Sequence, residues 1–259
     1  MKKLKRFLLV IYISNFCFKD CDKLTEISIP HLSAFNECLS LMQVYIPSSV
    51  VIFGDDIFTG IKFLEIEGTI TNVPSNLFRN NKTLKILRIS TPIEIIWENS
   101  FEGCTSLSQI ILASTLIQIG DNALNRCNSL TEIILLNSVE QIGKYAFSKC
   151  ESLIKIKIPS SLFLIGQGAF SECSSLIEIT IPSYLIYIEK RTFEKCISLK
   201  KVHIPPSVIE IRDKAFMDCK SLKLISIPSK MTKIGKYAFN GCLALSEITI
   251  PSSITEIGD

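Results

Sequence analysis

The chain has 259 residues, 47% of them hydrophobic and 20% charged, with a formal net charge of +3. Because nucleic-acid binding normally needs a concentrated basic stripe, this weak and interspersed charge argues against nucleic acid as a partner. No segment reaches the roughly 20 consecutive apolar residues of a transmembrane helix, so we expect no membrane span. The chain has only two histidines, His31 and His203. This is few for a catalytic mechanism that depends on histidine, which argues against an enzyme.

A unit of 23 residues dominates the chain. Seven cysteines recur at this interval, namely Cys104, Cys127, Cys150, Cys173, Cys196, Cys219 and Cys242. A fixed period of this length indicates a solenoid in which each unit forms one coil.

Each coil is predicted to open with a short strand. In the coil that starts at Cys150, the apolar residues Leu153, Ile156 and Ile158 follow, and the last two alternate with more polar neighbours. This alternation is the period of a half-buried strand. Pro159 closes the strand, because proline has no amide hydrogen to donate to a β-ladder.

The rest of the coil is predicted to contain a second short strand and a turn. Leu162 and Ile165 form the apolar pair of the second strand, and Phe170 and Cys173 lie on one face of a helical or 3₁₀ turn. Glycine precedes this turn in five coils, at Gly120, Gly143, Gly166, Gly235 and Gly258. Trp97 occupies the same position in another coil, which indicates a crowded corner rather than a left-handed backbone position.

The array extends toward the N-terminus, where the coils depart from the regular pattern. The coil from Cys21 to Cys38 is short, the loop between Phe58 and Ile61 lacks three residues of the usual pattern, and Asn81 replaces the repeated cysteine. We count eleven strand motifs, which start at Leu24, Leu41, Ile61, Leu84, Leu107, Leu130, Leu153, Leu176, Leu199, Leu222 and Leu245. Parallel crossovers are right-handed, so we expect right-handed coils with parallel ladders.

We expect one continuous repeat domain over residues 10–259, after a basic and apolar start at residues 1–9. Residues 1–17 have two interpretations. They resemble the basic and apolar regions of a secretory signal, without a convincing cleavage site, yet residues 10–21 also align with residues 139–150 as half a coil. Both ends stop in the middle of a coil without a polar cap, which predicts either a fragment of a longer array or end-to-end self-association.

The pattern from Leu153 to Cys173 resembles the BspA-type, or Treponema-type, leucine-rich repeat. The resemblance covers the chain from about Val10 and implies a leucine-rich-repeat solenoid. It also implies a surface or secreted protein of the antigen or adhesin kind, because members are mostly surface or secreted proteins of bacteria and protists, and some bind host matrix proteins or other cells. The family has no catalytic residues to transfer to this chain.

Stacked coils would place neighbouring cysteine Cα atoms about 5 Å apart, within reach of a disulfide if the side chains reoriented. We instead expect a ladder of buried thiols that behave as small apolar residues. No cysteine pair matches a metal-site pattern, so we expect no metal and no cofactor. Asn81-Lys82-Thr83 is an N-glycosylation sequon, but its position in the cysteine ladder predicts that Asn81 is partly buried.

The face formed by the first strands is the predicted binding surface. One outward row contains Tyr45, Glu65, Arg88, Ile111, Ile134, Lys157, Thr180 and His203. The neighbouring row contains Gln43, Phe63, Ile86, Gln109, Glu132, Lys155, Glu178, Lys201, Leu224 and Glu247. Solenoids offer such a repeated face to partners.

From these rows we select ten candidate partner-binding residues: Tyr45, Phe63, Ile86, Arg88, Ile111, Ile134, Lys155, Lys157, Lys201 and His203. They form an apolar region, from Phe63 to Ile134, and a modestly basic region, from Lys155 to His203. An apolar patch on a solvated face can mark a partner site, although β-branched residues also favour strands wherever they point.

These observations predict a non-enzymatic surface or secreted protein that binds a protein or glycan, from a host or a cell surface, through its first-strand face. The alternative is an intracellular protein-interaction scaffold in the cytoplasm, or an orphan repeat fragment without a dedicated ligand. The two hypotheses differ in the fate of residues 1–17 and in the redox state of the cysteines.

Overall fold

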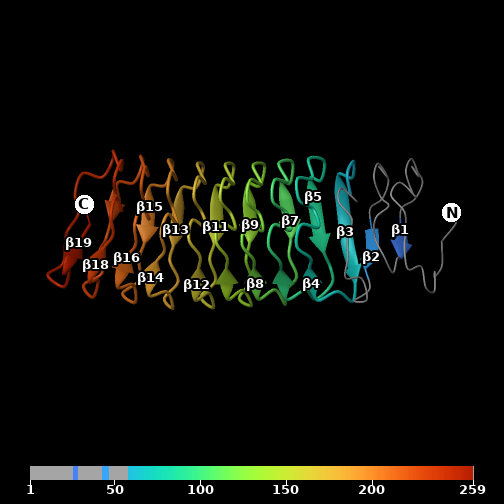
Figure 1. Cartoon of the computed structure of the whole chain (residues 1–259), viewed down its shortest axis with the longest axis horizontal. Helices are drawn as coiled ribbons and strands as arrows, with labels where there is room; N and C mark the ends of the chain where they lie inside the picture. The colour runs from blue at the N-terminus through green and yellow to red at the C-terminus, as the bar shows by residue number, and fades with distance from the viewer. Residues whose placement is uncertain (1–25, 29–42, 47–57, 259) are drawn as a thin grey trace.

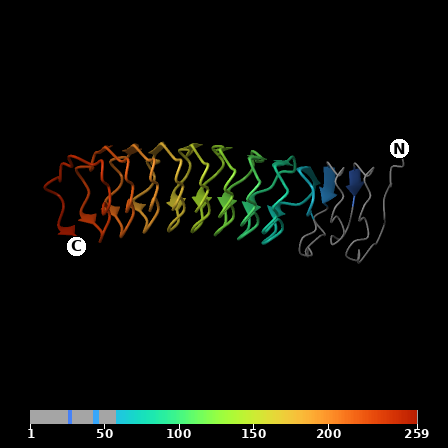
Figure 2. The ribbon, with the colours of Figure 1, turned by 90° about the horizontal axis from the view of Figure 1, so that it is seen from above.

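The computed structural model describes residues 26–28, 43–46 and 58–258, and within them the chain is a parallel β-solenoid (Figure 1). Coils of about 23 residues stack side by side along one axis, so the described part is a rod, as the view from above also shows (Figure 2). The predicted leucine-rich-repeat fold is confirmed. The choice between a signal and a half coil concerns residues outside the described ones.

One strand of each coil lies on the first-strand face. These strands are β1 (Glu26–Ser28), β2 (Gln43–Ile46), β3 (Phe63–Gly68), β5 (Ile86–Ile89), β7 (Gln109–Ile111), β9 (Glu132–Ile134), β11 (Lys155–Lys157), β13 (Glu178–Thr180), β15 (Lys201–His203) and β17 (Leu224–Ile225). All their pairings are parallel, and neighbours along the rod are one coil apart, as in Glu132 opposite Lys155. The central residue of each three-residue strand from β7 to β15 is buried and its neighbours are exposed, as the sequence pattern predicts.

A second series of strands, mostly of two residues, forms the second-strand face. These are β4 (Asn72–Val73), β6 (Ile95–Ile96), β8 (Gln118–Ile119), β10 (Gln141–Ile142), β12 (Leu164–Ile165), β14 (Tyr187–Ile188), β16 (Glu210–Ile211), β18 (Lys233–Ile234) and β19 (Glu256–Ile257). Their pairings are also parallel. The predicted second strand is therefore present.

The turn that closes each coil contains two left-handed residues. The first recurs at Asn76, Asn99, Asn122, Tyr145, Gly168, Arg191, Lys214 and Tyr237. The second recurs four residues later, at Asn80, Gly103, Arg126, Lys149, Glu172, Lys195, Asp218 and Gly241. Because these residues interrupt the right-handed backbone, the turn forms no regular helix in the part of the chain that the structure describes.

The turn nevertheless has the hydrogen bonds of a 3₁₀ turn and a second set between coils. The amide of Cys150 donates to the carbonyl of Phe147 in the same turn, at 3.2 Å. The amide of Phe147 donates forward, to the carbonyl of Ala169 in the next coil, at 2.8 Å. In the second-strand series the direction is reversed, since the amide of Gly143 donates to Ile119 in the preceding coil, at 2.8 Å.

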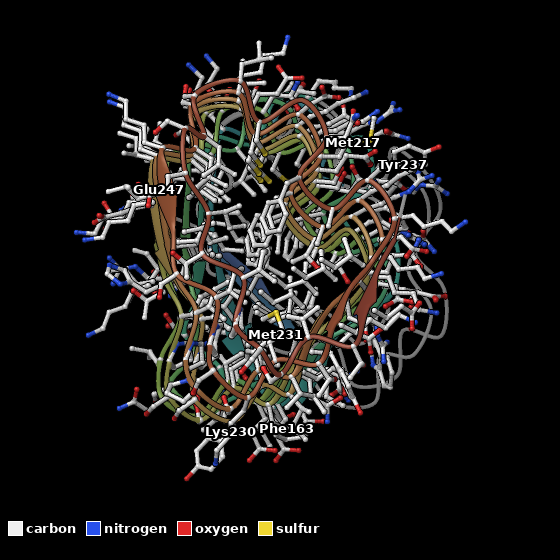
Figure 3. All side chains as sticks on the ribbon, turned by 90° about the vertical axis from the view of Figure 1, so that its left-hand side faces the viewer. Phe163, Met217, Lys230, Met231, Tyr237 and Glu247 are labelled. Atoms are coloured by element: carbon white, nitrogen blue, oxygen red, sulfur yellow. The ribbon has the colours of Figure 1, made fainter. Side chains whose placement is uncertain are left out.

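The core lies between the two strand faces and the turn, where side chains fill the interior of the rod (Figure 3). Phenylalanine rings of successive turns stack with centroids 5.0 to 5.7 Å apart, as in Phe147 on Phe170 and Phe170 on Phe193. The glycine corner is crowded, as predicted: a Cβ atom at Gly143 would lie 2.6 Å from the amide nitrogen of Asp121 in the preceding coil.

Two details of the predicted array differ from the structure. Tyr45 is opposite Glu67, not Glu65, so β2 and β3 are shifted by two residues relative to the predicted rows. The motif at Leu245 forms no strand among the described residues.

Candidate protein-binding face

The predicted apolar region on the first-strand face consists of two separate parts. Phe63 and Ile86 are opposite each other on β3 and β5, and both are only half-exposed. Ile111 and Ile134 lie on β7 and β9 in the neighbouring row, and Ile134 is 62% exposed. The second part is therefore the more accessible to a partner.

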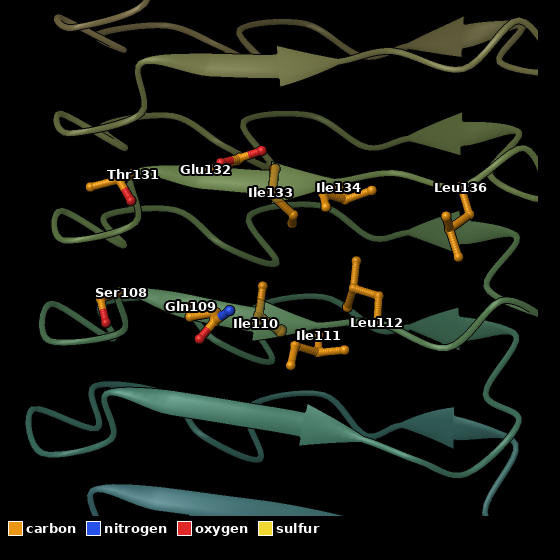
Figure 4. A pocket seen from close by; sticks show the side chains of 10 residues that line it. All are labelled: Ser108, Gln109, Ile110, Ile111, Leu112, Thr131, Glu132, Ile133, Ile134 and Leu136. Atoms are coloured by element: carbon orange, nitrogen blue, oxygen red, sulfur yellow. The ribbon is translucent and has the colours of Figure 1, made fainter.

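A groove separates β7 from β9. The sheet that begins at β1 ends at β7, and β9 pairs only with β11, so no strand pairing connects β7 to β9. The space between them measures about 580 Å³, and we call it the strand-gap groove (Figure 4). Its lining residues are Ser108, Gln109, Ile110, Ile111, Leu112, Thr131, Glu132, Ile133, Ile134 and Leu136.

The strand-gap groove is polar at one end and apolar at the other. Ser108 and Thr131 lie where the two strands begin, and Leu112 and Leu136 lie beyond their ends (Figure 4). Leu136 is 39% exposed. An apolar side chain of a partner would lose contact with water here, while its backbone could bond to the polar end.

The closing proline of the repeat does not predict this groove. The strand-closing position holds Pro159 in a regular coil but Ala113 and Leu136 in the two coils that line the groove. Ser90 occupies the same position although β5 pairs with β7, and β11 and β13 are unpaired although Pro159 and Pro182 close them, so the missing proline does not mark the interruption. Neither Leu136 nor the interruption was predicted.

The predicted basic region is also divided. Lys155 and Lys157 lie on β11, next to the strand-gap groove, and Lys157 is opposite Ile134. Lys201 and His203 lie on β15, with β13 between the two sites. All four side chains are exposed, and none forms an ion pair with another described residue.

The other two candidate residues lie away from the groove or outside the described side chains. Arg88 on β5 is exposed, 4.0 Å from the carboxylate of Glu65. Tyr45 belongs to β2, but its side chain is not among those described. The structure thus gathers Ile111, Ile134, Lys155 and Lys157 around one groove and leaves the remaining candidates elsewhere.

The stacked cysteines are hydrogen-bond donors, and all of them from Cys104 to Cys219 are buried. From Cys104 to Cys242, each sulfur lies 2.9 to 3.3 Å from a carbonyl oxygen of the preceding coil's turn. Burial raises the pKa of the Cys104 and Cys150 thiols to about 12, so they are almost entirely protonated at neutral pH. Thiols in this state are poor nucleophiles and poor metal ligands.

Asn81 takes the place of a thiol in this ladder. Its amide nitrogen donates to the carbonyl of Phe58 at 2.9 Å, and its amide oxygen accepts from the backbone nitrogens of Thr83 and Leu84. The residue is 6% exposed. In the folded chain the sequon is therefore inaccessible to glycosylation.

Other chemistry is sparse in the described part of the chain. No group of three or more His, Cys, Asp or Glu residues there is placed to hold a metal ion. The same residues include no helix with the length and apolarity to cross a membrane.

The stacked coils and parallel ladders define a leucine-rich-repeat solenoid. The sequence profile described as "BspA type Leucine rich repeat region" matches this chain in six copies over residues 3–33, 31–154 and 140–259. The chain belongs to the BspA-type leucine-rich repeat family. That profile describes repeats and indicates no catalytic family.

Solved structures show the same architecture. A leucine-rich repeat protein from Bacteroides ovatus is 26% identical, with a TM-score of 0.72, over 95% of this chain and 78% of that one. The leucine rich repeat protein of T. pallidum is 23% identical, with a TM-score of 0.59, over 86% of this chain and 84% of that one. None of the curated proteins matches the chain.

Proposed function

We propose that this chain is a non-enzymatic recognition protein that binds an extended segment of another protein at the strand-gap groove. The observation that supports the proposal is the 62% exposure of Ile134 at the edge of an apolar groove. A surface apolar side chain beside a groove favours burial by a partner.

The neighbouring charges favour an acidic segment. Lys155 and Lys157 are exposed on β11 beside the groove, and no described carboxylate pairs with either. A ligand with an apolar residue in the groove and an aspartate or glutamate over β11 would satisfy both features. Glu132, which is opposite Lys155, limits the net positive charge and disfavours a highly acidic polymer such as nucleic acid.

The binding test uses a displayed random-peptide library selected on the full chain. We expect enriched peptides to combine an apolar residue with acidic neighbours, and Ile134→Glu to weaken their binding at least about tenfold, which corresponds to about 1.4 kcal/mol. Ile197→Glu is the matched control, because Ile197 is 43% exposed but lies in a turn. Enriched peptides whose binding is unaffected by Ile134→Glu would refute the groove as the site.

We further propose that the protein acts at a cell surface or after secretion, as an antigen-like or adhesin-like protein. The support is membership of the BspA-type family together with an exposed recognition face. A membrane-impermeant label applied to intact cells should modify the protein and spare a cytosolic control. A protein that is labelled only after lysis would support the alternative, an intracellular interaction scaffold.

A further inference from the structure

A second apolar surface lies on the second-strand face, away from the strand-gap groove. It is formed by Phe163, Leu164, Tyr184, Ile186 and Tyr187, and we call it the second-strand patch. These side chains are between 38% and 67% exposed, and three of the five are aromatic. Clustered aromatic residues at this exposure are typical of protein interfaces rather than of ordinary surface.

The repeat itself does not require apolar residues at these positions. In the preceding coil Glu140 and Gln141 occupy the positions of Phe163 and Leu164. One coil before Tyr184, the same repeat position holds Ser161, whose hydroxyl donates to the carbonyl of Val139 in the neighbouring coil at 2.7 Å. Two adjacent coils have therefore exchanged polar side chains for exposed apolar ones, which strand propensity alone does not explain.

The ladder of second strands is interrupted within the second-strand patch. One sheet of second strands ends at β12, and the next begins at β14, with no pairing between them. The patch spans this interruption, since Leu164 belongs to β12 and Tyr187 to β14. The surface is thus a local departure from the repeat in both backbone pairing and side-chain character.

Along the rod, one repeat position of the patch is symmetric about Ile186. The same repeat position holds Glu140, Phe163, Ile186, Ile209 and Thr232, so three apolar residues lie between two polar ones. Successive positions are about 4.8 Å apart along the stack. A two-fold axis parallel to the strands through Ile186 would place Phe163 of one chain opposite Ile209 of a second, antiparallel copy.

The charges that border the patch fit the same symmetry. Glu140 lies two coils before the coil of Ile186, and Lys230 lies two coils after it. Both are exposed, and neither has an ion-pair partner among the described residues. Viewed down the rod, Lys230 and Phe163 point outward at the same edge (Figure 3).

The antiparallel arrangement would bring Glu140 near Lys230 of the second copy. Lys230 lies in the turn before β18, at a repeat position two residues before that of Glu140, and the two long side chains would span this offset. Opposite charges at equal distances on either side of an apolar centre favour a second copy of this chain over an unrelated partner. We propose that the second-strand patch pairs two copies of this chain in an antiparallel, two-fold symmetric dimer.

Sedimentation equilibrium of the full chain between about 1 and 100 μM tests this proposal. We expect a concentration-dependent dimer, and we expect Ile186→Glu to raise its Kd at least about tenfold, because like charges would meet at the two-fold axis. Ile134→Glu is the matched control, since Ile134 is similarly exposed on the other face. A chain that remains monomeric, or a dimer that is insensitive to Ile186→Glu, would overturn the proposal.

A charge exchange tests the antiparallel register. Glu140→Lys and Lys230→Glu should each raise the Kd, because each places like charges together, and the double variant should restore it to within about threefold of the original. Circular dichroism of each variant verifies the fold. Failure of the double variant to restore association would refute the pairing of Glu140 with Lys230. The dimer test is independent of the proposed function, because peptide binding at the strand-gap groove uses the opposite face.

Discussion

Replacing Phe170 with alanine tests whether the stacked phenylalanines hold the coils together. Phe170 is fully buried, and its ring stacks on Phe147 at 5.5 Å and on Phe193 at 5.7 Å. Losing the buried side chain costs about 1.5 to 3 kcal/mol of stability. Each of the two lost ring contacts costs about 0.5 to 1.5 kcal/mol more. We therefore expect Phe170→Ala to lower the free energy of unfolding by about 4 kcal/mol, within the range typical of such cavities.

Urea denaturation followed by far-ultraviolet circular dichroism measures this loss. Phe163→Ala is the control, because Phe163 is 49% exposed and should cost less than about 1 kcal/mol. Phe170→Leu should cost less than Phe170→Ala, since Leu124 fills the same repeat position in another coil and is fully buried. A loss under about 1 kcal/mol for Phe170→Ala, or a loss equal to that of Phe163→Ala, would refute the energetic role of the stack.

Three further predictions concern the turn and the thiol ladder. Asn81→Ala should cost about 1 to 3 kcal/mol in urea denaturation, because it leaves a buried carbonyl and two backbone amides without the partner they have now, whereas Asn81→Cys should restore part of the loss. Iodoacetamide at pH 8 followed by mass spectrometry should modify Cys242 faster than Cys150. Burial raises the pKa of Cys242 to about 11 and that of Cys150 to about 12, so a faster reaction at Cys150 would contradict this order. Gly168→Ala should lower the thermal midpoint, because a Cβ atom would collide with the ring of Tyr145; Gly168→Ala combined with Tyr145→Ala should recover part of the difference.

The sequence predicted the coil in detail wherever a position repeats for a structural reason. Leu153, Phe170 and Cys173 are all fully buried, as their recurrence indicated. The crowded glycine corner was predicted correctly because Trp97 at the same position excluded a strict left-handed requirement. Packing against the neighbouring coil imposes the same choice on every unit, so repetition reveals it.

The left-handed turn positions could not be predicted from residue type. Tyr145 and Lys149 have positive φ angles of 54° and 61°, although neither residue type favours this region. Forward hydrogen bonds from the turn to the next coil hold this geometry, and such bonds between coils have no signature in a single unit.

The candidate sites were predicted only in part for a related reason. Ile111 and Ile134 were identified because they face outward, but the strand-gap groove depends on a missing strand pairing. The second-strand patch was missed because only the first-strand face was considered, although Phe163 and Tyr184 depart visibly from the polar residues of neighbouring units. Both candidate surfaces thus lie where the chain departs from its repeat.

The opposed directions of hydrogen bonding make each coil an interchangeable unit. Amides of a turn donate hydrogen bonds to the next coil, and amides of a second strand donate to the preceding coil. Each junction therefore contains hydrogen bonds donated from both of its coils. A duplicated coil would present the same donors and acceptors to its neighbours. Gaining one whole unit would therefore move the flanking coils apart by about 4.8 Å. Such a gain between β11 and β12 would increase the distance from the strand-gap groove to the second-strand patch without removing a residue of either surface.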